Sequence, residues 1–206
     1  MANTTFNGPV RSENGFQTIS KNATTGVISV TSGDKMSAEA VGGAGIEGTA
    51  AVYITQVNRL KSDTSTNVNI AKTTIMIDLT GLKDGGTAGD IIGKDGAGVA
   101  YIAQVKTANQ GVVFGVTMQC VEAPAGGSAD IDLFSATEGT GVNDTAIGDL
   151  TETSIINGGT QAAGTLTAGG DIVADQYLYL VSQGTGDATY TAGRFLIEIT
   201  GYDVAS

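Results

Sequence analysis

Short runs in which apolar and polar residues alternate recur along most of the chain, and turn-forming residues separate them. The clearest run is Val68–Leu79, where every second residue from position 71 is apolar or threonine and the opposite set includes Lys72 and Asp78. A period of two places alternate side chains on opposite faces of a β-strand. No segment shows an apolar stripe at helical spacing, although Ser37–Val41 is compatible with one helical turn. The pattern therefore predicts strands nearly everywhere.

The strands expected from this pattern differ in how clearly they are marked. The clear ones are Ala50–Val57, Val68–Leu79, Val99–Val105, Val112–Val121, Asp130–Phe134, Tyr177–Ser182 and Arg194–Tyr202. A short pair at Phe16–Ser20 and Gly26–Thr31 precedes them, and weaker candidates are Ser154–Ile156, Thr165–Thr167 and Ala188–Thr191. Many short strands with turns between them are typical of an antiparallel sandwich. We therefore expect an all-β fold, an antiparallel and jelly-roll-like β-sandwich with an extended N-terminal arm.

The expected division of the chain follows from its polar and glycine-rich stretches. Residues 1–15 are polar and contain the turn dipeptides Gly8-Pro9 and Asn14-Gly15, which is typical of an extended arm. The stretch Gly42–Gly48 is predicted to be a flexible link. We therefore expect an N-terminal region at 1–48, with the arm, a short strand pair and the link, and a sandwich domain at 49–206. Ala136–Gly170 shows little patterning, which predicts a large functional or contact-making loop.

Charge is distributed unevenly along the chain. Up to Lys106 the acidic and basic residues balance, whereas the rest of the chain has many acidic residues and one base, Arg194, and so carries the whole formal charge of −11. An acidic surface repels phosphate backbones, which argues against nucleic acid as a partner. The neutral first half is the better place to expect a partner surface. Arg194 is predicted to pair with one or more carboxylates, and its replacement matters for stability only if the pair is buried.

Composition agrees with a β protein rich in tight turns. The chain has 31 glycines and no tryptophan or histidine, while 41% of its residues are hydrophobic. That share is enough for a core, which a disordered chain lacks. The single cysteine, Cys120, excludes an internal disulfide and is predicted to be a small buried side chain on the same face as Val112, Phe114, Val116 and Met118. No apolar run is long enough for a membrane helix.

The common chemical motifs fail on their context. Gly43–Gly48 has the glycine spacing of a dinucleotide-binding loop, but that loop needs a strand before it and a helix after it, and here a strand is expected at Ala50–Val57. Gly89–Lys94 is one residue short of a phosphate-binding loop and is predicted to be a turn. A chain without histidine cannot form a histidine-based triad or zinc site. We therefore expect no enzyme activity and no cofactor.

Two weaker alternatives concern carboxylates and tyrosines. Asp130 and Asp132 lie two apart on an expected strand and are predicted to be solvated on its outer face, with Ile131 and Leu133 inward. A calcium site built from Asp130, Asp132, Glu138 or Asp144 is the alternative, because Ca²⁺ favours clustered carboxylate oxygens. The tyrosines lie in or beside expected strands, where a shallow carbohydrate-binding face is a further alternative to ordinary half-buried packing.

Parts of the sequence resemble a known group of proteins. The opening Thr5–Phe16 is similar to the start of small structural proteins of marine tailed bacteriophages with cyanophage-like genomes. The second half resembles the same virion proteins over several blocks, namely Glu122–Gly127, Asp130–Gly141, Leu150–Thr153, Tyr177–Leu180 and Tyr190–Tyr202. Residues 31–65 contribute nothing to the resemblance. The matching motifs carry no chemistry, so they indicate a family and not an activity.

The resemblance implies a structural role on the virion. The first expectation is a capsid decoration (cement) protein. Cement proteins resemble β-sandwich or jelly-roll modules, are often trimers, and sit over junctions between capsid subunits. It implies the major capsid protein as partner, a homo-oligomer with a trimer favoured, synthesis in the host cytoplasm and a final place on the head surface, without nucleic acid or membrane. The alternative is a tail- or fibre-associated module that contacts host-surface glycan. The candidate partner-binding residues lie in the arm and are Phe6, Pro9, Val10, Arg11 and Phe16.

Overall fold

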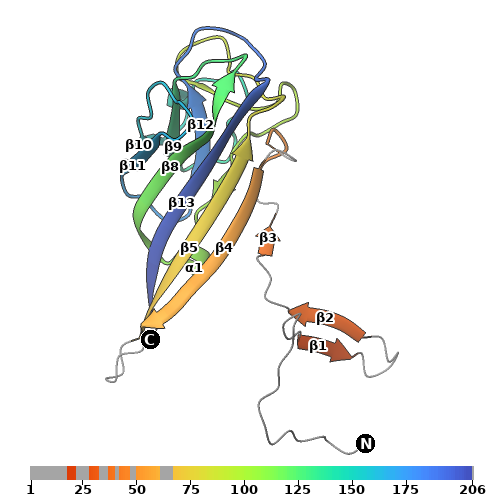
Figure 1. Ribbon diagram of the computed structural model, residues 1–206, viewed down its shortest axis with the longest axis vertical. Coiled ribbons are helices and arrows are strands. Elements are labelled where there is room, and N and C mark those ends of the chain that lie inside the picture. The colour runs from red at the N-terminus through yellow and green to blue at the C-terminus, as the bar shows by residue number, and fades with distance from the viewer. Residues whose placement is uncertain are drawn as a thin grey trace, which may run out of the picture. The chain divides into compact units, whose positions relative to one another are not determined.

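The computed structural model describes residues 18–21, 28–32, 37–39, 42–46, 50–60 and 67–205 (Figure 1). It divides the chain into two compact units, Met1–Met36 and Ser37–Ser206. Within the first unit, β1 (Thr18–Lys21) and β2 (Ile28–Ser32) form a two-stranded antiparallel sheet. The short strand pair expected from the sequence is therefore present.

The boundary between the units differs from the expected division at Gly48/Thr49. The glycine-rich stretch belongs to the second unit, where the Gly43 amide donates to the Tyr101 carbonyl at 2.9 Å and the Gly45 amide donates to the Val99 carbonyl at 2.8 Å. A Cβ atom at Gly43 would overlap the backbone of Val99, so this close approach requires glycine. The glycines of Gly42–Ile46 therefore serve backbone packing within the second unit, and a strand, not a helix, follows them.

A six-stranded antiparallel sheet forms one layer of the second unit. Its order is β11-β8-β13-β5-β4-β3, and β4, β5, β13 and β8 lie side by side in Figure 1. The bounds of these strands are β3 Ser37–Glu39, β4 Ala50–Leu60, β5 Asn67–Asp78, β8 Val112–Ala125, β11 Leu166–Gly169 and β13 Ala192–Ala205. The C-terminal strand β13 is central and pairs with β5 on one side and with β8 on the other.

A smaller antiparallel sheet forms the second layer. Its order is β10-β9-β12-β6. Strand β6 pairs with the end of β12 at Val181 and Ser182, and β7 pairs with the start of β12 at Tyr177 and Leu178. The bounds are β6 Asp90–Ile91, β7 Ala103–Gln104, β9 Ile131–Ala136, β10 Glu152–Ile156 and β12 Tyr177–Ser182. One core of fully buried apolar side chains joins residues from both sheets. Two antiparallel sheets around one core confirm the predicted all-β sandwich, while this strand order does not confirm the jelly-roll connectivity.

A short helix closes one end of the core. This helix, α1 (Thr107–Gln110), leads into β8, and the Gln110 side-chain amide donates to the Thr73 hydroxyl at 3.2 Å. Gln110 in turn accepts a hydrogen bond from the Lys106 amide at 2.8 Å. The buried Thr73 is therefore satisfied by a side chain that seals the sandwich, which fits the rule that buried polar groups find partners.

The alternation along β8 changes phase near its start. Cys120, Met118 and Val116 are buried as predicted, but Val112 and Phe114 are more than half exposed, so the prediction that all five share one face is wrong. The register with β13 shifts between Thr200 and Gly201, where Thr200 opposes Gly115 and Gly201 opposes Val113. Such a β-bulge inserts an extra residue and turns the following side chains to the other face. The bulge thus sends Phe114 to the outer side of the sheet.

The central strands of the second sheet, β9 and β12, are buried on both faces. In β12, Leu178, Tyr179, Leu180 and Val181 are all fully buried. The face away from the core is covered by the stretch that the sequence marked as a loop, Ala136–Gly170, which also contains β10, β11 and the 3-10 turn η1 (Ile147–Asp149). Gly141 lies so close to Tyr179, Ile91 and Leu150 that a Cβ atom there would overlap the Ile91 side chain. The loop makes contacts as expected, and those described are within the chain.

Several local expectations were wrong in type. Ser37–Glu39 is a strand and not a helical turn, and Asp90–Ile91 within the expected turn pairs as β6 with β12. Of the expected strand Val99–Val105, only Ala103–Gln104 is a strand. Thr189, within a weaker candidate, forms only an isolated bridge with Lys83. These segments are short, so their pairing partner decides their conformation more than their own pattern does.

Candidate functional site

A buried carboxylate ties together three loops at one end of the sandwich. Asp84 is 1% exposed, and its two oxygens accept hydrogen bonds from the amides of Ser128 and Ala188, both at 2.7 Å. The hydroxyl of Tyr190 donates to the Ser128 carbonyl at 2.9 Å, and burial raises the pKa of this tyrosine above its usual value. Hydrogen bonds to a charged acceptor are among the stronger ones. Asp84 therefore acts as a clamp for these loops.

Asp132 forms a second clamp of the same kind. Its carboxylate accepts from the Gly158 amide and from the Gln183 side chain, both at 2.8 Å. Asp132 is 3% exposed, so the prediction that this side chain is solvated is wrong; the flanking Ile131 and Leu133 are buried as expected. The cause is the following chain, which folds back over this face and supplies donors. The pKa of the partly exposed Asp130 is raised by burial and, to a lesser degree, by the Asp132 charge.

Glu138 fixes the covering loop against β12. Its two oxygens accept from the Thr151 amide at 2.9 Å and the Thr151 hydroxyl at 2.8 Å, and these bonds hold the pKa of Glu138 below its usual value. The Tyr179 hydroxyl donates to the Glu138 carbonyl at 2.8 Å, and burial raises the pKa of Tyr179 to about 12. Asp144 accepts from the Gly86 amide at 2.8 Å.

Three of the four carboxylates of the calcium alternative have separate structural partners. Asp132, Glu138 and Asp144 each accept hydrogen bonds from a different part of the chain. Within the described residues, no three Asp, Glu, His or Cys side chains come together in a way that would hold a metal ion. The arrangement favours loop clamps over a calcium site.

Cys120 lies in the core with its thiol shielded from solvent. Its Sγ donates to the Glu122 carbonyl at 3.2 Å, and burial raises the pKa of the thiol. A raised pKa leaves little thiolate at neutral pH, which disfavours reactivity. The prediction of a small buried side chain is confirmed for Cys120.

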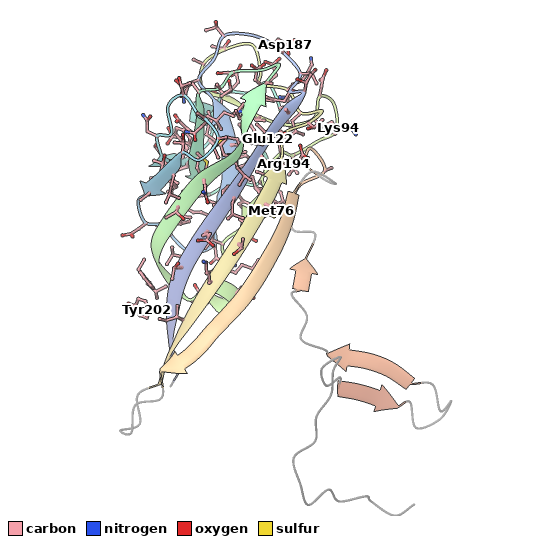
Figure 2. The ribbon with its side chains drawn as sticks, in the orientation of Figure 1. Met76, Lys94, Glu122, Asp187, Arg194 and Tyr202 are labelled. Carbon is pink, nitrogen blue, oxygen red and sulfur yellow. The ribbon has the colours of Figure 1, made fainter. Side chains whose placement is uncertain are left out.

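Arg194 pairs with two carboxylates, as predicted. Its Nε lies 3.0 Å from Asp78 Oδ2 and 3.4 Å from Glu122 Oε2, and Figure 2 shows Arg194 and Glu122 together on the sheet face. The hydrogen bond from Arg194 to Asp78 raises the pKa of Arg194. The hydrogen bonds from Thr80 to the Asp78 carboxylate lower the pKa of Asp78. The arginine side chain is 53% exposed, so water competes for each partner.

Because the pair is exposed, we expect Arg194→Ala to change stability little. The melting temperature should fall by no more than about 3 °C, as losing an exposed ion pair does in a protein of this size. Thermal denaturation followed by circular dichroism measures this, with Lys72→Ala as a matched control because Lys72 also pairs across the sheet, with Glu198. A much larger fall for Arg194→Ala alone would mean that the pair supports the separate register shift between β13 and β8 that lies at Arg194.

The outward surface of the six-stranded sheet carries exposed apolar side chains. Two strips, which we call together the outer face, run across β11, β8, β13 and β5. One strip contains Leu166, Leu196 and Met76, which are joined in register through Gln119. The other contains Val112, Phe114 and Tyr202, and the rings of Phe114 and Tyr202 lie 6.1 Å apart between centroids. Figure 2 places Met76 and Tyr202 at separate positions along the length of this sheet.

The outer face went unrecognised in the sequence because its residues are far apart in the chain and are brought together by strand pairing. The predicted partner-binding residues Phe6, Pro9, Val10, Arg11 and Phe16 all lie outside the described residues. The site therefore consists of the outer face and the clamped loops of the second unit. No helix in the described part of the chain has the length and hydropathy needed to span a membrane.

Comparison with known proteins adds no relative. No family model matches the chain, and neither a curated protein nor a solved structure matches it.

Proposed function

We propose that the chain is a non-enzymatic structural protein of a bacteriophage virion, and that it decorates the head. In this role it binds the outer surface of the major capsid protein as a homo-oligomer and stabilises the shell. It is made in the host cytoplasm and ends on the head surface, without nucleic acid or membrane partners. The resemblance of Thr5–Phe16 and of the blocks between Glu122 and Tyr202 supports this role.

The observation that carries the proposal is the use of buried carboxylates as clamps. Asp84 and Asp132 are buried carboxylates, and all four of their oxygens accept hydrogen bonds that join neighbouring loops. Satisfied buried polar groups of this kind make a surface rigid and unique in shape. A rigid sandwich with fixed loops suits a protein that must keep its shape on a particle, and we assign contact with the shell to the first unit.

The acidic half supports an outward orientation for the loops. Exposed carboxylates gather in them, for example Asp149, Asp171, Asp175 and Asp187. A strongly acidic surface keeps particles soluble and discourages them from adhering to one another. The first unit, with three basic and two acidic residues, is then the part assigned to contact with the capsid.

A glycan-binding module at the tail or a fibre is the second candidate. One observation favours it: Tyr101 and Tyr177 are both partly exposed, and their ring centroids lie 4.9 Å apart in an edge-on arrangement at 64°. Aromatic rings with a polar tip are suited to contact with ligands that have apolar and polar faces.

Imaging of particles tests the proposal against this alternative. Purified chain is added to heads assembled from the major capsid protein alone and to complete particles that lack this chain, and both are examined by electron cryo-microscopy. We expect additional density that repeats with the capsid lattice on both kinds of particle. A few copies at the tail would favour the glycan-binding alternative, and no added density on either would contradict both roles.

A further inference from the structure

We propose that the outer face is a self-association surface through which two copies of this chain pack against each other. The inference concerns the six-stranded sheet alone and holds whether or not the protein decorates a capsid. Antiparallel sheets often leave one face to solvent, and that face then alternates with polar residues. On the outer face, exposed large apolar side chains stand among these polar residues.

Exposed large apolar side chains of the described residues are concentrated on this sheet. Val142 and Val173 are the exceptions; the others all come from β5, β8, β11 and β13. They are Met76, Val112, Phe114, Val121, Leu166 and Tyr202. Single exposed apolar residues are ordinary on proteins, whereas a group on one flat face indicates an interaction surface. In the second sheet β9 and β12 are buried on both faces, so among the described residues the outer face is the sheet surface on which exposed apolar side chains gather.

The charges on the outer face are paired within the face itself. Lys72 pairs with Glu198, while Arg194 pairs with Asp78 and with Glu122. These two bases and three acids leave a net charge of −1, compared with −11 for the whole chain. A strongly basic partner would gain little electrostatic attraction to the outer face, and a strongly acidic partner would gain none. Because its described charges nearly cancel, a second copy meets little repulsion at the outer face.

The outer face is also large enough for a stable dimer. The adjacent strands β8, β13 and β5 have 14, 14 and 12 residues, and β11 adds 4. With strands about 4.8 Å apart and about 3.4 Å per residue, the outer face covers about 700 Å². A standard interface takes about 800 Å² from each partner. Pairing one face with the same face of another copy is isologous, so the expected product is a two-fold symmetric dimer.

The test is the molar mass of the full chain in solution, measured by sedimentation over a range of concentrations. We expect a concentration-dependent shift from the 20.7 kDa monomer to twice that mass. Raising the ionic strength should strengthen the association, because salt screens the repulsion between two acidic chains and weakens no ion pair that crosses the interface.

Two variants place a charge in each apolar strip, Met76→Glu and Phe114→Glu. Both side chains are exposed, at 42% and 53%, so the fold should survive, which circular dichroism checks. Each should raise the dissociation constant of the dimer at least about tenfold, because a carboxylate would be buried without a partner. Val173→Glu is the matched control, since it adds the same charge at an exposed valine outside the sheet and should leave the dissociation constant within about twofold.

Several results would overturn the proposal. A wild-type chain that remains monomeric at all concentrations and salt levels contradicts it, and so does a trimer, which needs two different patches. Equal weakening by Met76→Glu and Val173→Glu would assign the effect to net charge and not to the outer face. If neither Met76→Glu nor Phe114→Glu weakens a dimer that does form, the copies meet elsewhere.

Discussion

Replacing Asp84 with alanine is expected to lower the stability of the sandwich by about 3–5 kcal/mol, because two charge-assisted hydrogen bonds are lost together. The amides of Ser128 and Ala188 each donate to this carboxylate at 2.7 Å. Both amides are partly buried, and an alanine would leave them facing a small cavity that water enters poorly. For a chain of this length, the loss corresponds to a fall in melting temperature of about 10 °C.

Two further variants separate the hydrogen bonds from the negative charge. Asp84→Asn keeps one acceptor oxygen but places an amide opposite the second donor, so it should lose roughly half as much stability. Asp95→Ala removes a charge of the same sign from a side chain that is 72% exposed and pairs only with Lys83, so its melting temperature should hardly change. If Asp84→Ala and Asp95→Ala melt at the same temperature, the clamp does not hold the loops.

The long strands could be predicted from the sequence because few conformations besides the β-strand place alternate residues on opposite faces over many positions. Val68–Leu79 and Tyr177–Ser182 were located to within a residue. The short pieces β3, β6 and β7 could not be predicted from their own two or three residues, because each is fixed by its partner strand; for β6 and β7 that partner is the distant β12. The glycine-rich stretch at 42–46 was assigned to a link for the same reason, because its backbone contacts with residues 99–101 are not visible in composition.

The candidate site was less predictable than the fold. An extra residue at the β8 bulge reverses the face of Phe114, and nothing in an alternating sequence marks where such a bulge falls, apart from the neighbouring Gly115. Asp132 was expected in water because alternation predicts which face a side chain is on, but not whether a later loop covers that face. The pairing of Arg194 was predictable, because a lone base among many acids finds a carboxylate by charge alone.

Removing residues 1–36 is expected to abolish binding to the capsid while leaving the second unit folded. Every strand from β3 to β13 pairs within residues 37–205, so the truncation removes no partner of either sheet of the sandwich. A two-stranded sheet such as β1–β2 is only marginally stable by itself, so contact with a partner surface would stabilise the first unit. The melting temperature of the truncated chain should therefore match that of the full chain within a few degrees.

Changes confined to the arm test whether its candidate residues make the contact with the capsid. Burial of a phenylalanine contributes about 1.5–3 kcal/mol, so Phe6→Ser combined with Phe16→Ser should weaken binding to capsids about a hundredfold or more in the full chain. A chain lacking only residues 1–15 should lose nearly as much as one lacking residues 1–36, because it lacks Phe6, Pro9, Val10 and Arg11. Co-sedimentation with capsids measures each affinity, and Val173→Glu serves as a full-length surface control. Unchanged affinity on loss of residues 1–36 would exclude the first unit as the anchor, whereas failure of the truncated chain to fold would assign residues 1–36 to the sandwich itself.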